Sequence, residues 1–172
     1  TYDGNGNRLT AITSAGIFTG TYDNQDRLLT YGQNTYSYNA NGDLLTKTNP
    51  QGTTHYLYDA QGNLLSVTLP DGTLIEYIID LANRRIAKKV NDSLVKTWLY
   101  SGTLRPIAEL DASGNVTARY VYATQENMPD FFIANNVQYR IFADLLGSPR
   151  LVIDTQSNEI TQSVEYDSFG NV

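Results

Sequence analysis

A short run of residues recurs along the chain, and this repetition constrains the fold more than any other feature of the sequence. Its clearest copy is the segment 54–67, in which Tyr56 and Tyr58 precede the residues 59–63, Asp-Ala-Gln-Gly-Asn. Residues two apart on a strand point to the same face, and Asp, Gly and Asn are residues that tight turns favour. The segment therefore predicts a β-hairpin, with residues 64–67 as the returning strand.

Further copies repeat this hairpin at intervals of roughly 20 residues, a period typical of solenoids and other repeat arrays. The residues before and within the turns of the copies are Tyr2 and Asp3, Tyr22 and Asp23, Tyr38 and Asn39, Tyr58, Asp59 and Gly62, Ile79 and Asp80, and Tyr166 and Asp167. A weaker copy covers residues 110–117. We interpret these positions as the structural repeat positions of an array of hairpins.

Turns of this kind are predicted at residues 3–7, 23–26, 39–42, 59–63, 80–83 and 111–115. A second kind of turn, exemplified by the Pro-x-Gly segments 49–53 and 69–73, is expected to close the opposite ends of the hairpins. The segments between turns have ordinary strand length, about five to eight residues. The predicted fold class is therefore all-β, an antiparallel β-hairpin repeat array with almost no room for helix.

Residues 123–136 interrupt the pattern and predict a loop followed by a short apolar strand at 131–133. Strands are predicted after it at residues 139–144, 150–154 and 160–166. We divide the chain into a hairpin array at 1–122 and a segment at 123–172 that continues the same sheet. Because the sequence starts and stops within a repeat, we expect it to be a piece of a longer polypeptide.

Composition excludes several classes of protein. The net charge of −6 argues against nucleic-acid binding, which calls for a basic surface. The one basic cluster, Arg84, Arg85, Lys88 and Lys89, alternates faces on a strand and is interpreted as solvent-facing or edge-protecting. The absence of cysteine excludes disulfides and thiolate chemistry. No apolar run approaches the roughly 20 residues of a membrane-spanning helix, and no targeting signal is recognised.

Two sets of residues resemble the Rhs/YD-repeat family, which is named for its Tyr-Asp dipeptide. The first is the repeat itself, as in Tyr22-Asp23 and Tyr58-Asp59. The second resembles the Rhs-associated core, whose hallmark reads Asp-His-Leu-Gly-Ser-Pro/Val-Arg and is followed by Tyr-Asp-Pro-Phe-Gly. The matching residues are Asp144, Leu145, Leu146, Gly147, Ser148, Pro149 and Arg150, and then Tyr166, Asp167, Ser168, Phe169 and Gly170. Leu145 and Ser168 depart from the hallmark, which has His and Pro there.

This resemblance implies a function. In the family the repeats form a β-sheet that spirals into a hollow shell around a C-terminal toxin in bacterial Rhs effectors and toxin complexes, and related shells occur in teneurin adhesion receptors. The chain is thus expected to be a secreted or cell-surface structural segment that encloses a toxin or effector region of the same polypeptide, without catalysis of its own. Many members continue into an aspartyl self-cleavage element, which these residues do not contain.

The residues that could act as metal ligands or catalytic groups are better explained by structural roles. Residues 3–7 alternate oxygen-bearing side chains like a calcium loop, but Arg8 and Ser14 stand where that loop needs Gly and Glu. His55 is the single histidine and cannot supply a metal cluster or a triad by itself. We therefore expect no metal and no cofactor.

Three carboxylates near the hallmark segments, Asp144, Asp154 and Asp167, could form an acid–base pair only if the fold brought two of them together. Asp at a strand end is more often a turn residue. The sequence around Ser148 lacks the Gly-x-Ser-x-Gly frame of a nucleophile elbow. No catalytic residue is predicted.

The pairs Tyr36/Tyr38, Tyr56/Tyr58, Tyr77/Ile79 and Tyr120/Tyr122 predict an aromatic band on one sheet face. Cross-strand stabilisation is the preferred interpretation. The alternative that stays open is a cell-surface module that binds carbohydrate or protein through this band. Because a piece of a repeat array leaves its terminal strands without partners, we also expect neighbouring repeats as partners, or self-association.

Overall fold

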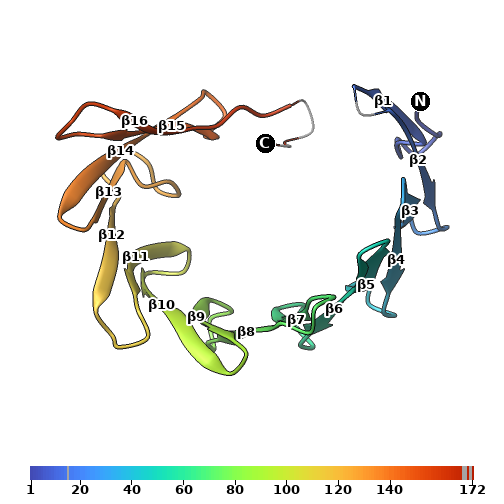
Figure 1. Ribbon diagram of the computed structural model, residues 1–172, viewed down its shortest axis with the longest axis horizontal. Helices are drawn as coiled ribbons and strands as arrows, with labels where there is room; N and C mark the ends of the chain where they lie inside the picture. The colour runs from blue at the N-terminus through green and yellow to red at the C-terminus, as the bar shows by residue number, and fades with distance from the viewer. Residues whose placement is uncertain (15, 168–169, 171) are drawn as a thin grey trace. The chain divides into compact units, whose positions relative to one another are not determined.

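The computed structural model describes residues 1–14, 16–167, 170 and 172. These residues contain sixteen β-strands and no helix, which confirms the all-β prediction (Figure 1). The strands are β1 (Thr10–Thr13), β2 (Gly16–Tyr22), β3 (Leu28–Tyr31), β4 (Asn34–Tyr38), β5 (Leu44–Asn49), β6 (Gly52–Tyr58), β7 (Leu64–Thr68), β8 (Leu74–Ile79), β9 (Arg85–Val90), β10 (Ser93–Ser101), β11 (Arg105–Leu110), β12 (Val116–Val121), β13 (Phe131–Ala134), β14 (Val137–Ala143), β15 (Pro149–Asp154) and β16 (Ile160–Ser163). Their order in the sheet is their order in the sequence. The described part of the chain has no helix that could span a membrane.

All six predicted turns are present, and each closes with a backbone hydrogen bond between its first and fourth residues. Among the strands predicted after residue 123, two bounds differ from the prediction by more than one residue. β16 ends at Ser163 rather than at residue 166, although the Val164 amide still donates to the Arg150 carbonyl at 2.8 Å. β14 begins earlier than predicted, at Val137, because Asn135 and Asn136 both adopt positive φ and reverse the chain within two residues.

Residues 69–73 connect β7 to β8 at the opposite end of the hairpins, as predicted, but their bonding pattern does not differ from that of the first kind of turn. The Leu69 amide donates to the Thr73 carbonyl, and the Gly72 amide donates to the Leu69 carbonyl, both at 2.9 Å. This is the bonding pattern of the Asp-initiated turns, so Pro70 and Gly72 build the same reversal from different residues. The loop before β13 is present as predicted, and Pro106 lies at a register shift near the start of β11, as its position in a strand requires.

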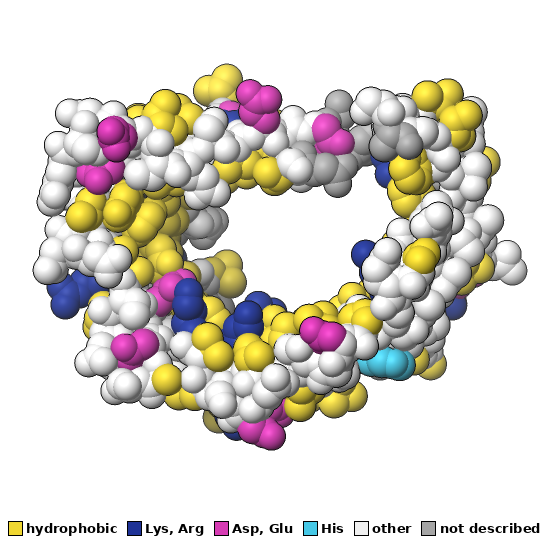
Figure 2. All heavy atoms as spheres, in the orientation of Figure 1, with side chains coloured by type: hydrophobic (Ala, Val, Ile, Leu, Met, Phe, Trp, Pro, Cys, Tyr) yellow, Lys and Arg dark blue, Asp and Glu magenta, His cyan; other side chains and the backbone are white. Residues whose placement is uncertain are grey.

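The chain forms two compact units, one of Thr1–Ile78 with Lys89–Ser93 and the other of Ile79–Lys88 with Leu94–Val172. Among the described residues, only four hydrophobic side chains are buried, and these are Val67, Ala87, Ala108 and Ala118. Hydrophobic side chains accordingly remain visible at the molecular surface (Figure 2). Within each unit the contacts join strands that are consecutive in sequence. The sheet therefore stabilises itself mainly through neighbouring strands rather than through a central core.

The sheet of the first unit has two chemically different faces. Directly opposed residues of neighbouring strands share a face, and one such row carries a threonine on five strands in succession. The row consists of Thr21, Thr30, Thr35, Thr48 and Thr53. Hydroxyl oxygens are hydrogen-bonded across it, Thr21 to Thr30 at 2.7 Å and Thr48 to Thr53 at 2.9 Å. We call this side the threonine face.

The other side of the same strands is the tyrosine face, which carries Tyr36, Tyr38, Tyr56 and Tyr58. Ser37 and His55 lie on the threonine face because each is a direct partner of Thr46. The tyrosines alternate with them along β4 and β6, so they point to the opposite side. All four tyrosines are half-buried, whereas Ser37 and His55 are exposed. The sequence predicted the tyrosine band but not the threonine row.

Candidate functional site

The repeated turn is organised by the carboxylate of its first residue, as residues 59–63 show. One oxygen of Asp59, Oδ1, accepts hydrogen bonds from the amides of Gln61 and Asn63 at 2.8 and 2.9 Å. The other, Oδ2, accepts from the Asn63 side chain at 2.8 Å. The fourth residue, Gly62, has φ of 82°, a left-handed conformation that glycine adopts at little cost. Together these bonds define a type I turn followed by a bulge.

The bulge is visible as a register shift at the residue before the turn. Tyr58 pairs with Leu64, but Leu57 pairs with Ser66, so one residue of β7 is left over. Equivalent shifts occur at Tyr22 and Tyr38. The tyrosine of each of these pairs is therefore the last residue of its strand, at the bulge that precedes the turn.

Other copies keep this geometry with different donors. Asn7 and Asn115 donate their side-chain amides to Asp3 and Asp111, in the manner of Asn63. In the copy at 39–43 the two groups are exchanged, since the amide of Asn39 donates to the carboxylate of Asp43 at 2.8 Å. The pairing of an amide with a carboxylate is thus retained while the positions swap.

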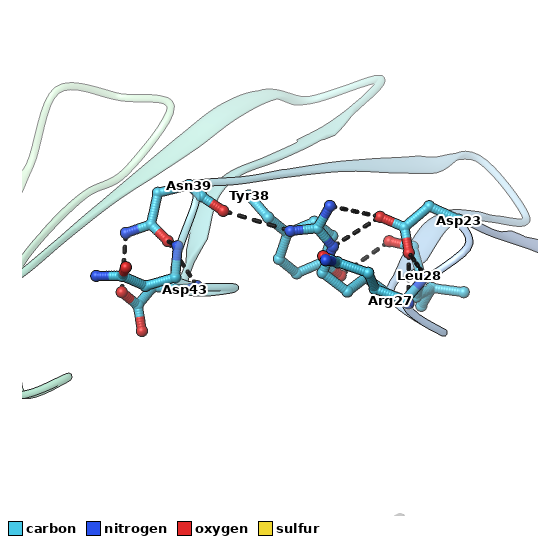
Figure 3. A network of polar contacts seen from close by, with 8 residues as sticks. Asp23, Arg27, Leu28, Tyr38, Asn39 and Asp43 are labelled. Atoms are coloured by element: carbon cyan, nitrogen blue, oxygen red, sulfur yellow. Dashed lines mark hydrogen bonds and ion pairs between the residues drawn. The ribbon is translucent and has the colours of Figure 1, made fainter.

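Arginine supplies the donor in two further copies and adds contacts beyond the turn (Figure 3). The Arg27 guanidinium pairs with the Asp23 carboxylate at 2.6 Å and donates to the Asn39 carbonyl at 3.3 Å. It also lies over the Tyr38 ring, 5.4 Å from the ring centroid. Such a contact between a cation and an aromatic face is favourable. Arg27 therefore joins its own turn to the turn of the next hairpin.

Arg84 repeats this arrangement in the second unit. It pairs with Asp80 at 2.6 Å, donates to the Gly102 carbonyl at 2.6 Å and lies over the Tyr100 ring at 5.2 Å. Ile79, which precedes Asp80, is half-buried. In both units, an arginine side chain thus links its own turn to the next hairpin.

Tyrosine hydroxyls form a second set of links between hairpins. Tyr22 donates to the carbonyl of Arg8 at 3.2 Å, and Tyr38 donates to that of Leu28 at 2.8 Å. In the second unit, Tyr100 and Tyr122 donate to the carbonyls of Arg85 and Pro106 at 2.9 and 3.0 Å. Each acceptor lies at or near the start of a strand that follows an earlier turn. These hydroxyls hold successive hairpins together.

The hallmark segment is another copy of the turn. The Asp144 Oδ1 accepts from the amides of Leu146 and Ser148, both at 3.0 Å, and Gly147 has φ of 86°. Arg150 donates to Asp144 Oδ2 at 2.9 Å. Pro149 begins β15, where no ladder amide is required of it. The hallmark residues Asp144, Gly147, Ser148, Pro149 and Arg150 are thereby brought together in one turn, and Ser148 contributes its amide to it.

The last copy is described only in part. Tyr166 lies under the Arg150 guanidinium, which is 4.8 Å from its ring centroid. The Gly170 amide donates to the Asp167 carbonyl at 3.1 Å. The hallmark positions Ser168 and Phe169 and the neighbouring Asn171 lie outside the described residues.

The electrostatics of the turns keep their carboxylates ionised. The hydrogen bond from the Asn63 side chain, followed by that from the Asn63 amide, lowers the pKa of Asp59. The hydrogen bond from the Arg84 side chain lowers the pKa of Asp80 in the same way. A carboxylate whose pKa is lowered in this manner is a poor proton donor at neutral pH.

Other candidate residues are kept apart or already occupied. Asp154 Oδ1 accepts from the Gln156 amide at 2.7 Å, so Asp154 stabilises a turn of its own, as Asp144 does. His55 is exposed between Thr46 and Thr68 on the threonine face. Among the residues that the structure describes, no group of three His, Cys, Asp or Glu residues could hold a metal ion.

A polar cluster around Glu109 was missed by the sequence analysis. Its carboxylate pairs with Lys96 and accepts from Trp98 Nε1 at 3.1 Å. Burial opposes the ionisation of Glu109, but hydrogen bonds from Lys96, Tyr120 and Trp98 outweigh it and lower the pKa. Burial, and then the contact with Glu109, raises the pKa of Tyr120. Trp98 and Glu109 are direct cross-strand partners. The register that pairs them could not be predicted from the sequence.

Aromatic side chains continue from this cluster across the second unit. Tyr120 lies 6.1 Å from Phe132, which stacks on Tyr139 at 4.9 Å between ring centroids. These residues are opposed on neighbouring strands. The Glu109 carboxylate is hydrogen-bonded by its neighbours, and the aromatic rings beside it are packed against one another. We interpret this cluster as stabilising the sheet.

Comparison with known proteins places this architecture in a family. Residues 1–172 match the family described as Teneurin YD-shell. No curated protein matches the sequence. Among solved structures, the TcdB2-TccC3-TEV crystal structure is 12% identical with a TM-score of 0.47, and covers 98% of this chain and 12% of that one. The TcdB2-TccC3 crystal structure is 14% identical with a TM-score of 0.46, covering 94% and 11%. The Photorhabdus luminescens Tc holotoxin pore is 12% identical with a TM-score of 0.44, covering 94% and 12%.

The chain thus spans only a small part of the length of each of those solved chains. The family match, by contrast, includes every residue from 1 to 172. The chain has repeated Asp-initiated turns and a single sheet whose strands follow the order of the sequence. The chain belongs to the teneurin YD-shell family, and it is a structural segment of a YD-repeat shell.

Proposed function

We propose that this chain is a length of shell wall that encloses the C-terminal toxin or effector region of the same polypeptide. The observation that carries the proposal is the scarcity of buried side chains, four hydrophobic ones among the described residues. A globular domain of about 150 residues buries roughly 70% of the surface that its unfolded chain exposes. A sheet that encloses other polypeptide has no such requirement, because its contents cover one face.

Neighbouring repeats of the same polypeptide are the second set of partners, since β1 and β16 are the edge strands of the sheet and repeats of an array pack against their neighbours. Residues 1–122 form the hairpin array of this wall, and residues 123–172 continue the same sheet as a core-like segment. The full polypeptide is exported or displayed at a cell surface. The family membership supports this role, and the net charge of −6 gives nucleic acid no basic surface to bind.

The wall carries no catalysis of its own in this proposal. The support is that the turn carboxylates are engaged by backbone amides and side-chain donors, as at Asp59 and Asp144. The purified chain is expected to stay intact over days at neutral pH, and so is the Asp144→Asn variant. Two discrete products that appear in the parent chain but not in this variant would contradict the proposal.

Limited proteolysis of the full-length polypeptide tests the enclosure. The downstream region is expected to resist a nonspecific protease until the wall is opened by denaturant. As a matched comparison, the downstream region expressed alone is digested at the same protease concentration. Equal digestion of the enclosed and isolated regions would show that the wall does not enclose them.

The alternative role, recognition of carbohydrate or protein by the tyrosine band, is less well supported. Within the band, the hydroxyls of Tyr38 and Tyr122 already donate to backbone carbonyls, so these two are engaged in holding the hairpins together. Binding of glycans on an array, abolished by Tyr56→Ala, would favour the alternative.

A further inference from the structure

A cavity of about 550 Å³ opens at the edge of the first unit, away from the Tyr-Asp turns. It lies between two neighbouring hairpin ends, the reversal at residues 31–34 and the reversal at residues 49–52, and β2 forms its third side. Its volume falls within the range of small-molecule sites, roughly 300 to 1,000 Å³. Nothing in the shell role described above requires an opening here.

Gly32 and Phe18 both line the cavity and are packed against each other. A Cβ on Gly32 would lie 2.9 Å from the ring of Phe18, so the ring rests directly on the glycine backbone. Gly52 at the next hairpin end is packed in the same way, since a Cβ there would lie 2.8 Å from the Pro70 side chain. The Phe18 ring is also fixed from the side, because it stacks on Tyr31 at 5.9 Å and 15°.

The polar side chains of the cavity are four amides, two on each hairpin end, and the hydroxyl of Thr19 from β2. Asn34 Nδ2 donates to the Tyr31 carbonyl at 3.1 Å, which fixes that amide and directs its oxygen away from the bond. Asn49 Oδ1 accepts from the Gln51 amide at 3.0 Å, which fixes the second amide with its nitrogen available. Gln33 and Gln51 are exposed. The lining thus offers hydrogen-bond donors and acceptors from both sides.

The remaining surface is apolar and uncharged. Ile17 is 70% exposed, and Pro50 is exposed across the cavity from it. Among the described residues that line the cavity there is no Asp, Glu, Lys, Arg or His. A charged ligand would lose its hydration here without gaining an opposite charge.

We propose that this cavity binds a neutral saccharide of one or two rings. A pyranose offers hydroxyls that both donate and accept, which matches the four amides, and C–H faces that match the ring of Pro50 and the side chain of Ile17. None of the four tyrosines that define the tyrosine face lines the cavity, and the proposal does not depend on the enclosure of cargo.

An extended peptide fits the cavity less well than a saccharide. A peptide gains affinity by adding a strand to free backbone groups. Here part of the backbone is already paired, since the Gly32 amide donates to the Thr19 carbonyl at 3.0 Å, and Asn49 pairs with Gly52. The side-chain amides are therefore the main polar groups that a ligand can use, and these suit hydroxyl groups.

Saturation-transfer NMR on the purified chain tests the proposal with cellobiose, maltose and diacetylchitobiose as probes. At least one of them is expected to receive saturation at its ring C–H protons and to bind with a dissociation constant in the millimolar range. The double variant Gln33→Ala/Gln51→Ala removes two hydrogen-bonding groups and is expected to weaken binding by about tenfold. Both residues are exposed, so the fold is retained, which the amide spectrum verifies.

Gln61→Ala is the matched control, because Gln61 is an exposed glutamine in a hairpin turn outside the cavity. This variant is expected to bind as the parent chain does. Three results would overturn the proposal: no transfer to any of the three disaccharides, equal binding by the double variant, or tighter binding of a sulfated disaccharide or of an uncharged hexapeptide. None of these results bears on the protease protection that tests the shell role.

Discussion

The Tyr38 hydroxyl, at the end of β4, donates a hydrogen bond to the Leu28 carbonyl at the start of β3, with 2.8 Å between the oxygens. Leu28 is also the direct partner of Tyr22, the tyrosine of the preceding repeat. One hydroxyl thus connects two successive Tyr-Asp positions through a single backbone group.

Removal of this hydroxyl by Tyr38→Phe is expected to lower the free energy of unfolding by about 1 kcal/mol, the usual net value of a hydrogen bond. Tyr38→Ala also removes the half-buried ring beneath Arg27 and is expected to cost about 2–3 kcal/mol, as is Tyr58→Ala. Urea unfolding at neutral pH measures the differences. Tyr2→Phe serves as control, because Tyr2 is 57% exposed, and an equal loss in that variant would contradict the account.

Much of this local structure could be predicted from the sequence, and the reason is physical. Asp59 and Gly62 fix their turn through bonds within five residues, so a short pattern suffices to locate it. The threonine row and the Glu109 cluster depend on which residues of two strands lie opposite each other. That register is shifted by each bulge, and the bulge is not apparent from residue types alone. The cavity beside Gly32 depends on the packing of Phe18, which could not be predicted from the sequence either.

The exchange of amide and carboxylate between the copies at 39–43 and 59–63 makes a direct test of the turn. Asp59→Asn alone places two amide nitrogens against each other, and Asn63→Asp alone opposes two carboxylates. Each single variant is expected to unfold at lower urea concentration than the parent chain. The double variant Asp59→Asn/Asn63→Asp copies the arrangement of Asn39 and Asp43 and is expected to recover most of the loss. Additive losses in the double variant would mean that the two side chains do not act as a pair.

Acid is expected to release the loop before β13. Hydrogen bonds from the Thr124 hydroxyl and amide, and then from the Ala123 amide, lower the pKa of Asp130 to about 2. Because the folded pKa lies below the unfolded one, this contribution to stability is complete above about pH 4 and is lost as the pH falls toward 2. NMR titration of the Asp130 carboxyl carbon measures the midpoint.

Thr124→Val removes the hydroxyl donor and is expected to raise that midpoint. A midpoint near the ordinary aspartate value in the parent chain would show that the loop bonds do not hold in solution.

The terminal strands are expected to make the isolated chain associate with itself. All four residues of β16 are exposed, and a strand at the edge of a sheet offers unpaired amides and carbonyls to another chain. Light scattering over a dilution series should show a mass that rises with concentration. Ile160→Lys, which places a charge on an exposed edge residue, is expected to reduce this rise. A mass that stays monomeric at high concentration would refute the expectation.

Thiol labelling tests the wall most directly, because the chain has no cysteine of its own. Thr35→Cys places a thiol on the threonine face, and Lys47→Cys places one beside Tyr36 on the tyrosine face. Each variant is labelled with a maleimide in the isolated chain and in the full-length polypeptide, freed of any other cysteine. The two faces of a wall differ in their access to solvent, because one faces the enclosed region. Enclosure should therefore slow labelling at one of the two positions by at least about tenfold, which corresponds to about 1.4 kcal/mol of protection. The labelling rate at the other position should not change. Equal rates at both positions in both contexts would contradict the shell role.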